Sequence, residues 1–319
     1  MALYLITGMA GFIGSSLAEA LIARGEQVRG IDNLSTGKRE NLACLKGKAE
    51  FLEADITDPR ASAEACRGVD YIFHEAAIPS VPRSVKDPAE TNHACVTGTV
   101  QLLIAARDAK VRRVVYASSS SLYGDTPTLP KHEGMLPNPI SPYAVAKLTG
   151  EYYMKSFFRV YGLETVSLRY FNVFGPRQDP TSMYSGVLAK FIPRMLRNER
   201  PTIYGDGEQS RDFTFIQNVV EANLLACHAP ASQVAGMAFN AATGSRSTLN
   251  LTYKILQKLT GYTGVPEYGP ERVGDIKHSL ADISLANKHF GYKPSVTLEQ
   301  GLKRTVEWYR QSMAVTAPA

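Results

Sequence analysis

Cysteine and histidine are scarce in this sequence, and neither is arranged to hold a disulfide or a metal ion. The four cysteines (Cys44, Cys66, Cys95 and Cys227) lie far apart and form no CxxC pair, which favours buried thiols. The six histidines show neither HxxxH nor HExxH spacing, so no metal site is expected. We therefore expect reduced cysteines and a function that needs no bound metal.

Long apolar runs and long basic runs are also missing. No apolar stretch reaches the roughly 18 residues of a membrane-spanning helix, and the first residues lack the regions of a signal peptide. Charge is nearly balanced, with 35 Lys and Arg against 30 Asp and Glu, and the excess of +5 is scattered along the chain. We therefore expect a soluble, cytoplasmic protein with neither a membrane nor a nucleic acid as partner.

Short apolar runs alternate with helical patterns over the first half of the 319 residues. Strands are predicted at residues 3–7, 27–31, 50–54, 71–74, 113–117 and 164–169. The main helices are predicted at residues 15–24, 89–109 and 143–161. Strands that alternate with helices imply right-handed crossovers, and hence an α/β fold built on a doubly wound parallel sheet.

A glycine-rich loop, Gly8 to Gly14, joins the first predicted strand to the first helix. Glycines at 8, 11 and 14 allow a sharp turn, close approach to a pyrophosphate and tight packing of helix on strand. Asp32 follows 18 residues after Gly14, where a carboxylate binds the adenosine ribose hydroxyls and repels a 2′-phosphate. The sequence therefore predicts a Rossmann site for NAD, although Lys38 and Arg39 leave a 2′-phosphate possible.

The chain changes character after residue 170, where glycine, proline and arginine become frequent and the alternation weakens. Residues 213–216 and 237–241 nevertheless have the pattern of strands that return to the sheet. We predict an NAD-binding domain over residues 1–170, completed by strands from about residues 211–242. A smaller, discontinuous substrate domain is predicted over residues 171–210 and 243–319.

Tyr143 and Lys147 are four residues apart at the start of a predicted helix, so their side chains share one face. A lysine ammonium beside a phenol lowers the phenol's pKa from about 10 toward neutrality and makes it usable as a general base. The fifth strand ends in the serines at 118–121, at the sheet edge where open α/β folds bind ligands. We expect these hydroxyls to line the same site.

With these motifs in this order, the chain resembles the extended short-chain dehydrogenase/reductases, and within them the UDP-sugar 4-epimerases. The likeness is strongest to bacterial UDP-N-acetylglucosamine 4-epimerases that supply polysaccharide synthesis. It runs over nearly the whole sequence, and the segments that carry it are residues 80–84, 118–125, 168–175, 205–213 and 278–284. The resemblance implies an isomerase that holds NAD tightly and works through a 4-keto sugar.

The resemblance also implies roles for particular residues. Tyr143 would be the base, Lys147 its partner, and Ser119 the catalytic serine that hydrogen-bonds the reacting oxygen. The expected cofactor-binding residues are Gly8, Gly11, Phe12, Ile13, Gly14, Asp32, Asn33, Ser35, Thr36, Gly37, Asp55, Ile56, Ala76, Ala77, Asn92, Tyr143, Lys147 and Tyr170. The expected substrate-binding residues are Arg83, Ser119, Ser120, Ser121, Tyr143, Asn172, Gln178, Tyr204, Arg211, Arg272, Asp275 and Ser279.

Ser279 bears on the choice of sugar. It stands three residues before the aspartate of the Ala-Asp-x-Ser segment at 281–284, a position that in the family limits the group on C2 of the sugar. A tyrosine there admits plain hexoses only, whereas a serine leaves room for an N-acetyl group. UDP-N-acetylglucosamine and UDP-N-acetylgalactosamine are therefore the expected pair, while UDP-glucose/galactose and UDP-glucuronate stay open as alternatives.

Other activities of the same scaffold fit less well. Dehydratases of the family carry an Asp-Glu pair where this chain has Ser120 and Ser121, and decarboxylases carry a Glu at the second of these positions. Non-catalytic NAD-sensing proteins lack the Tyr or the Lys, whereas this chain has Tyr143 and Lys147. The helices near residues 90–108 and 145–160 carry apolar faces that relatives pair across subunits, so a homodimer is expected.

Overall fold

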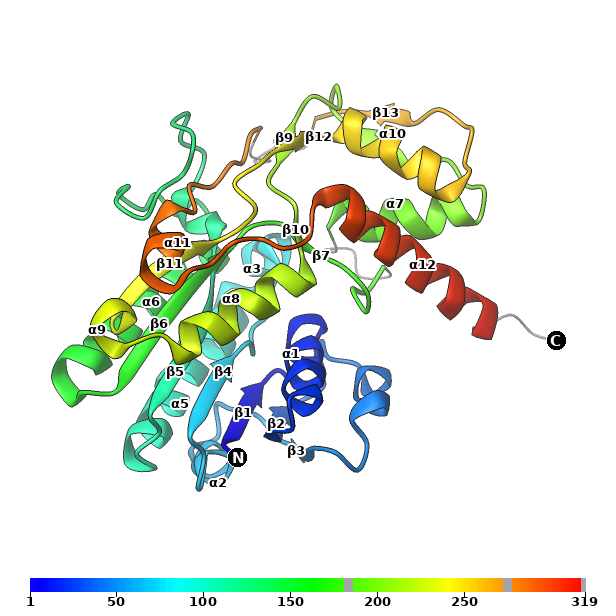
Figure 1. Cartoon of the computed structure of the whole chain (residues 1–319). Helices are drawn as coiled ribbons and strands as arrows, with labels where there is room; N and C mark the ends of the chain where they lie inside the picture. Colours follow the sequence, from blue (N-terminus) through cyan, green and yellow to red (C-terminus); the bar gives the residue numbers. More distant parts are fainter. Residues whose placement is uncertain (181–185, 272–276, 317–319) are drawn as a thin grey trace.

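A seven-stranded parallel sheet forms the centre of the chain (Figure 1), in a computed structural model that describes residues 1–180, 186–271 and 277–316. The strand order is β11-β6-β5-β4-β1-β2-β3. The strands are β1 (Leu3–Thr7), β2 (Gln27–Asp32), β3 (Glu50–Glu53), β4 (Tyr71–His74), β5 (Arg113–Ser119), β6 (Glu164–Tyr170) and β11 (Met237–Ala241). The order reverses between β1 and β4, so the sheet is doubly wound and the predicted fold class is confirmed.

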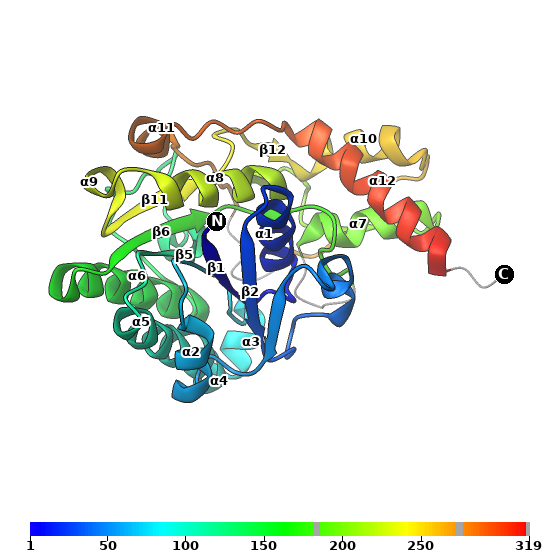
Figure 2. The ribbon, with the colours of Figure 1, turned by 60° about the horizontal axis from the view of Figure 1, so that its bottom comes forward.

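Helices cover both faces of the sheet (Figure 2). On one face α2, α4, α5 and α6 pack together, and on the other α8 lies beside α1. These helices are α1 (Phe12–Ala23), α2 (Pro59–Cys66), α4 (Pro88–Asn92), α5 (Gly98–Asp108), α6 (Pro142–Tyr161) and α8 (Ile216–His228). The helix predicted over residues 89–109 is divided, because a π-helical turn at His93–Thr97 joins α4 to α5.

The limits of α6 follow from the residues at its two ends. The Ser141 side chain accepts a hydrogen bond from the backbone of Ala144, and a proline fills the first turn, where no N–H is needed. Gly162 ends the helix in the left-handed conformation, with φ of 73°. A Cβ on Gly150 would lie 2.2 Å from the hydroxyl of Tyr116, so glycine there lets α6 approach β5 closely. The helix is thereby held against the strand whose end carries Ser119.

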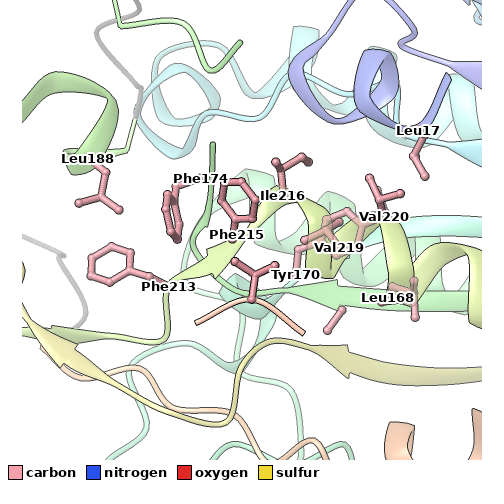
Figure 3. Packing of buried hydrophobic residues seen from close by; sticks show 14 of the residues in the cluster. Leu17, Leu168, Tyr170, Phe174, Leu188, Phe213, Phe215, Ile216, Val219 and Val220 are labelled. Atoms are coloured by element: carbon pink, nitrogen blue, oxygen red, sulfur yellow. The ribbon is translucent and has the colours of Figure 1, made fainter. Parts of the chain in front are cut away.

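The hydrophobic core extends from the sheet into the C-terminal half of the chain (Figure 3). Its labelled members are Leu17, Leu168, Tyr170, Phe174, Leu188, Phe213, Phe215, Ile216, Val219 and Val220. The ring centroid of Phe174 lies 5.6 Å from that of Phe215 and 6.3 Å from that of Phe213. These aromatic rings pack the segments that follow β6 against α8, so both halves of the chain share one core.

The C-terminal half adds three two-stranded sheets, β10-β7, β12-β9 and β13-β8. Its strands are β7 (Val173–Phe174), β8 (Thr202–Tyr204), β9 (Ser210–Arg211), β10 (Thr214–Phe215), β12 (Ser247–Thr248) and β13 (Glu267–Gly269). Its helices are α7 (Val187–Leu196), α9 (Ala231–Val234), α10 (Leu249–Thr260), α11 (Ser284–Phe290) and α12 (Leu298–Thr316). Within the described ranges, every helix is too short or too polar to cross a lipid bilayer.

Of the two strands predicted to return to the large sheet, only one does so. Residues 237–241 form β11, which pairs with β6 in parallel register. Residues 213–216 were predicted to join the same sheet, but there β10 pairs with β7 instead. The large sheet has no place for β10 beside β6, because β5 and β11 already occupy both edges of that strand.

Candidate active site

A cleft of about 590 Å³ opens beside the strand ends of the large sheet. Segments that follow β1, β2, β3, β4, β5 and β6 all contribute to its walls, as expected at the carboxyl edge of a doubly wound sheet. The predicted site residues that line it are Gly8, Gly11, Phe12, Ile13, Gly14, Asp32, Asn33, Ser35, Thr36, Asp55, Ile56, Ala76, Ala77, Arg83, Ser119, Tyr143, Tyr170, Asn172 and Gln178. The fold thus brings the glycine loop, Asp32 and Tyr143 to one surface.

The glycines at 8, 11 and 14 leave the backbone without side chains at three positions around the start of α1. A Cβ on Gly14 would lie 2.2 Å from the carbonyl oxygen of Gly8, and one on Gly8 would lie 2.9 Å from the backbone of Ala76. Gly11 precedes the helix without a side-chain cap, and the first turn carries no acidic residue. The backbone amides at this helix start are therefore suited to an anion such as a pyrophosphate.

Replacing Gly14 by alanine is expected to displace this loop and to weaken NAD binding roughly tenfold or more, because overpacking costs roughly 1–3 kcal/mol. NAD affinity, measured by calorimetry, tests the expectation. Gly134→Ala is a matched control, since its Cβ would meet only the His132 side chain, at 3.3 Å. Equal NAD affinity in both variants would show that the loop tolerates the added carbon.

Asp32 lines the cleft, and its side chain also binds the backbone of the glycine loop. Its carboxylate accepts hydrogen bonds from the backbone N–H groups of Ala10, at 2.9 Å, and Leu34, at 2.8 Å. Burial raises the pKa of Asp32, and these two donors lower it. Gly37 packs behind the carboxylate, where a Cβ would lie 2.9 Å from one oxygen, and so supports the site without lining it.

Lys38 and Arg39, the two cations that could have held the 2′-phosphate of NADP, are already paired with acids. Lys38 Nζ lies 2.9 Å from a carboxylate oxygen of Asp179, and Arg39 pairs with Glu53. Asp32 meanwhile faces the cleft, where a 2′-phosphate would meet its charge. The described residues thus fit NAD better than NADP.

Tyr143 and Lys147 meet Ser119 at the end of β5. The ammonium of Lys147 is buried, donates to the carbonyl oxygen of Ala117 at 2.7 Å, and lies 5.9 Å from the ring centroid of Tyr143. The ammonium also lies 5.0 Å from the ring centroid of Tyr116. The three predicted catalytic groups are therefore neighbours, although Lys147 stands behind Tyr143 and does not line the cleft.

The predicted lowering of the Tyr143 pKa by Lys147 is not seen in the protein alone. Burial raises the pKa of Tyr143 above that of an ordinary phenol, and only a hydrogen bond with Ser119 opposes the rise. Burial lowers the pKa of Lys147 from its usual range. The prediction assumed a solvated pair, whereas here desolvation disfavours the charged form of both groups.

A buried ion pair lies behind the serines of β5. Arg169 holds Glu151 through two hydrogen bonds, of 2.9 Å to Oε1 and 2.8 Å to Oε2, and both side chains are almost fully buried. Ser118 Oγ donates to the same carboxylate, and Arg169 also donates to the hydroxyl of Tyr123 at 2.8 Å. Glu151 thus joins α6, two turns beyond Tyr143, to the strand end that carries Ser119.

The remaining predicted residues do not themselves line the cleft. Those described but not lining the cleft are Gly37, Asn92, Lys147, Ser120, Ser121, Tyr204, Arg211 and Ser279. Arg211 donates to the carbonyl oxygens of Ser210 and Lys277, and Tyr204 is 38% exposed on the surface. Arg272 and Asp275 fall outside the described residues.

The sequence reasoning missed several residues that line the cleft. Glu75 follows β4 directly, so the strand-end rule applied to the serines of β5 would have found it. Asp179 and Arg177 lie in an irregular segment, and their partners Lys38 and Glu19 are more than a hundred residues away in sequence. No local pattern marks such pairs. Among the described residues, no three acidic, histidine or cysteine side chains are grouped to hold a metal.

Comparisons with known proteins agree on one family. The model of the NAD dependent epimerase/dehydratase family matches residues 4–242. A UDP-glucose 4-epimerase from Thermotoga maritima, solved with UDP-glucose, is similar over 98% of this chain and 99% of its own, with 41% identity and a TM-score of 0.92. A UDP-N-acetylglucosamine 4-epimerase from Methanobrevibacter ruminantium, solved with UDP-N-acetylmuramic acid, is similar over the same shares, with 40% identity and a TM-score of 0.92.

A third solved structure carries both ligands that the motifs predict. It is a UDP-glucuronic acid 4-epimerase from Bacillus cereus, in complex with UDP-glucuronic acid and NAD. It is 32% identical and covers 97% of this chain and 99% of its own, with a TM-score of 0.89. These three similar proteins act at the same sugar position and differ in the sugar that their names give.

Proposed function

The chain belongs to the NAD dependent epimerase/dehydratase family and is a UDP-sugar 4-epimerase with NAD as cofactor, and we propose that its preferred pair is UDP-N-acetylglucosamine and UDP-N-acetylgalactosamine. The resemblance inferred from the motifs is confirmed at the level of the family and the cofactor. The sugar itself is the part that we propose.

The side chain at position 279 carries the proposal. Ser279 Oγ lies 3.5 Å from Nδ2 of Asn172, and Asn172 lines the cleft. Asn172 is held by a second hydrogen bond, to the carbonyl oxygen of Asp212, and its φ of 35° is one that asparagine tolerates better than most residues. A tyrosine at 279 would extend toward this part of the cleft, whereas the serine leaves room for the N-acetyl group of a hexosamine.

Different residues of the cleft have different roles in the proposed reaction. We assign the pyrophosphate of NAD to the start of α1 and the adenosine ribose to Asp32. NAD, when bound, supplies the hydride acceptor and a positive charge. Tyr143, in its phenolate form, would accept the proton of the sugar's 4-hydroxyl as C4 gives up hydride, and Ser119 would hydrogen-bond the same oxygen. Once the 4-keto sugar has turned its other face, Tyr143 would return the proton to the oxygen on C4, and C4 would take back the hydride from the reduced cofactor.

Turnover of the purified protein, without added NAD, tests the proposal. UDP-N-acetylglucosamine, UDP-glucose and UDP-glucuronate are supplied in parallel, and the C4 epimers are resolved by NMR. We expect the N-acetyl sugar to have the highest kcat/KM. A faster reaction of glucose or glucuronate would overturn the choice of sugar, and a 4-keto-6-deoxy sugar or a pentose as product would overturn the epimerase assignment itself.

Ser279→Tyr should reverse the preference. We expect kcat/KM for the N-acetyl sugar to fall roughly 10-fold to 100-fold, because the larger side chain takes the space of the acetyl group, while UDP-glucose is affected little. Ser245→Tyr, at an exposed position outside the cleft, controls for a general effect of an added ring. An equal loss of kcat/KM for both sugars would show that the residue at position 279 does not determine the sugar preference.

We also propose that two copies pair through α4, α5 and α6. Apolar side chains stand exposed on the outer face of α6, including Val145 at 50% and Tyr152 at 59%. A second hollow of about 580 Å³ lies between α4 and α6, lined by Val96, Val145 and Pro88 among others. A second copy of the chain would cover this face. Sedimentation at micromolar concentration should give twice the mass of 34.9 kDa, and a monomer would contradict the pairing.

A further inference from the structure

One carboxyl group at the reacting end of the cleft has no role in the mechanism above. Glu75 follows β4 and lines the cleft with Tyr143 and Tyr170. The other acids of the cleft wall are engaged elsewhere: Asp32 with the backbone of the glycine loop, Asp55 with Asn33 and Thr57, and Asp179 with a lysine. The place of Glu75 therefore calls for an explanation of its own.

A chain of hydrogen bonds holds Glu75 in one position. The hydroxyl of Tyr170 donates to Glu75 Oε1 at 2.8 Å, and Nδ2 of Asn223 donates to that hydroxyl at 2.7 Å. Asn223 is fully buried and also donates to the carbonyl oxygen of Val219, at 2.8 Å. Since Tyr170 gives its only proton to Glu75, this carboxyl oxygen is an acceptor, and the hydrogen bond orients the carboxyl group.

The titratable groups around Glu75 belong to α6, β4 and β6. Lys147 of α6 attracts its ionised form, and the charge of Glu75 contributes to the raised pKa of Tyr143 on the same helix. Burial keeps His74, next to it on β4, neutral, with a pKa of about 3. Among the described residues, no cation forms an ion pair with Glu75. Burial raises the pKa of Glu75 to about 7, while Tyr170 and Lys147 oppose the rise.

A half-buried carboxylate that is held by a hydrogen bond and has no cation of its own favours a positive charge placed near it. In an NAD enzyme the nicotinamide has to reach the reacting groups, and here these are Ser119 and Tyr143, at the end of the cleft that Glu75 shares. The oxidised nicotinamide carries a positive charge and the reduced ring carries none. The two redox forms therefore interact differently with Glu75.

We propose that the Glu75 carboxylate, held by Tyr170, stabilises the oxidised form of the bound cofactor relative to the reduced form. The hydride that C4 gives up during turnover then returns readily to the sugar, with its two electrons, and no outside oxidant is needed. The inference rests on NAD as the cofactor and is independent of which UDP-sugar is the substrate.

The test compares the affinities of NAD⁺ and NADH without any sugar, from about pH 6 to about pH 8. In the unaltered protein the ratio of the NADH Kd to the NAD⁺ Kd should rise with pH, as Glu75 ionises. Glu75→Gln keeps the acceptor for Tyr170 and loses the charge. We expect the ratio to fall roughly tenfold at the upper pH, which corresponds to about 30 mV in the two-electron potential, and to lose its pH dependence.

Glu133→Gln is the matched control. Glu133 is also a carboxyl whose pKa is raised by burial, and it accepts a hydrogen bond from the backbone of Asn240, but it does not line the cleft. Its variant should follow the unaltered protein. A ratio for Glu75→Gln within twofold of the unaltered protein, or an equal shift in Glu133→Gln, would overturn the inference.

Tyr170→Phe gives an independent measurement. Loss of the donated hydrogen bond should raise the pKa of Glu75 further, so the midpoint of the pH-dependent ratio should move to higher pH. An unchanged midpoint would count against the inference even if Glu75→Gln did not fold. Failure of the sugar proposal would leave all these binding results unaffected.

Discussion

Tyr143→Phe is expected to lower kcat roughly 10²-fold to 10⁴-fold, the usual contribution of a positioned general base. Phenylalanine keeps the ring that packs at the start of α6 and removes only the hydroxyl that is to accept the proton of the sugar. NAD binding and the melting temperature should therefore change little. Rates with a saturating UDP-sugar, followed by NMR over hours, give the loss directly.

A second tyrosine serves as the control for this variant. Tyr116 is buried on β5, its ring centroid lies 5.0 Å from the ammonium of Lys147, and it does not line the cleft. Tyr116→Phe removes the same atom near the same lysine and should keep kcat within a few-fold. If Tyr143→Phe retained more than a tenth of the activity, the proton would have to go to another group.

Removing Glu151 is expected to produce the largest loss of stability among the changes considered. Glu151→Leu leaves the guanidinium of Arg169 buried and unpaired, and breaking a buried pair costs roughly 3–5 kcal/mol in the free energy of unfolding. Ser118 would lose its acceptor as well. Urea unfolding followed by tryptophan fluorescence and by circular dichroism measures the change.

Two comparisons separate the buried pair from a general effect of charge. Glu199 pairs with Arg197 on the surface, where both side chains are about half exposed, so Glu199→Gln should lower the stability far less than Glu151→Leu does. Replacing Arg169 by methionine together with Glu151→Leu should recover part of the loss, because no unpaired charge stays buried. A double variant no more stable than Glu151→Leu would mean that packing, and not charge, explains the effect.

The strands and the nucleotide site could be predicted because local patterns determine them. Apolar runs mark β1 to β6, and the glycine loop with Asp32 has a spacing that few other structures require. The strand prediction at residues 213–216 was wrong about the partner, since Phe213 and Phe215 show the same alternation whichever strand they join. Pairing depends on which edge is open, and that is a property of the assembled sheet.

The electrostatics of the site could not be predicted from spacing. The four-residue interval correctly places Tyr143 and Lys147 on one face of α6, but it does not reveal that Lys147 is buried and Tyr143 half-buried in the cleft wall. Burial reverses the direction of the pKa shift that a solvated pair would show. The ion pair between Lys38 and Asp179 joins residues that are 141 positions apart in sequence, and only the folded chain brings them together.

The path of the chain through β6, β10, α8 and β11 limits how such enzymes can be recombined. The chain leaves the sheet after β6, returns for β11, and leaves it again. A chimera with a single junction near residue 170 would take its edge strand from one parent and the neighbouring strand from the other. Exchange of sugar preference between relatives is therefore better attempted by replacing the segment between β6 and α8 together with the segment after β11. The α8–β11 segment then comes from the same parent as β6, and the large sheet stays whole.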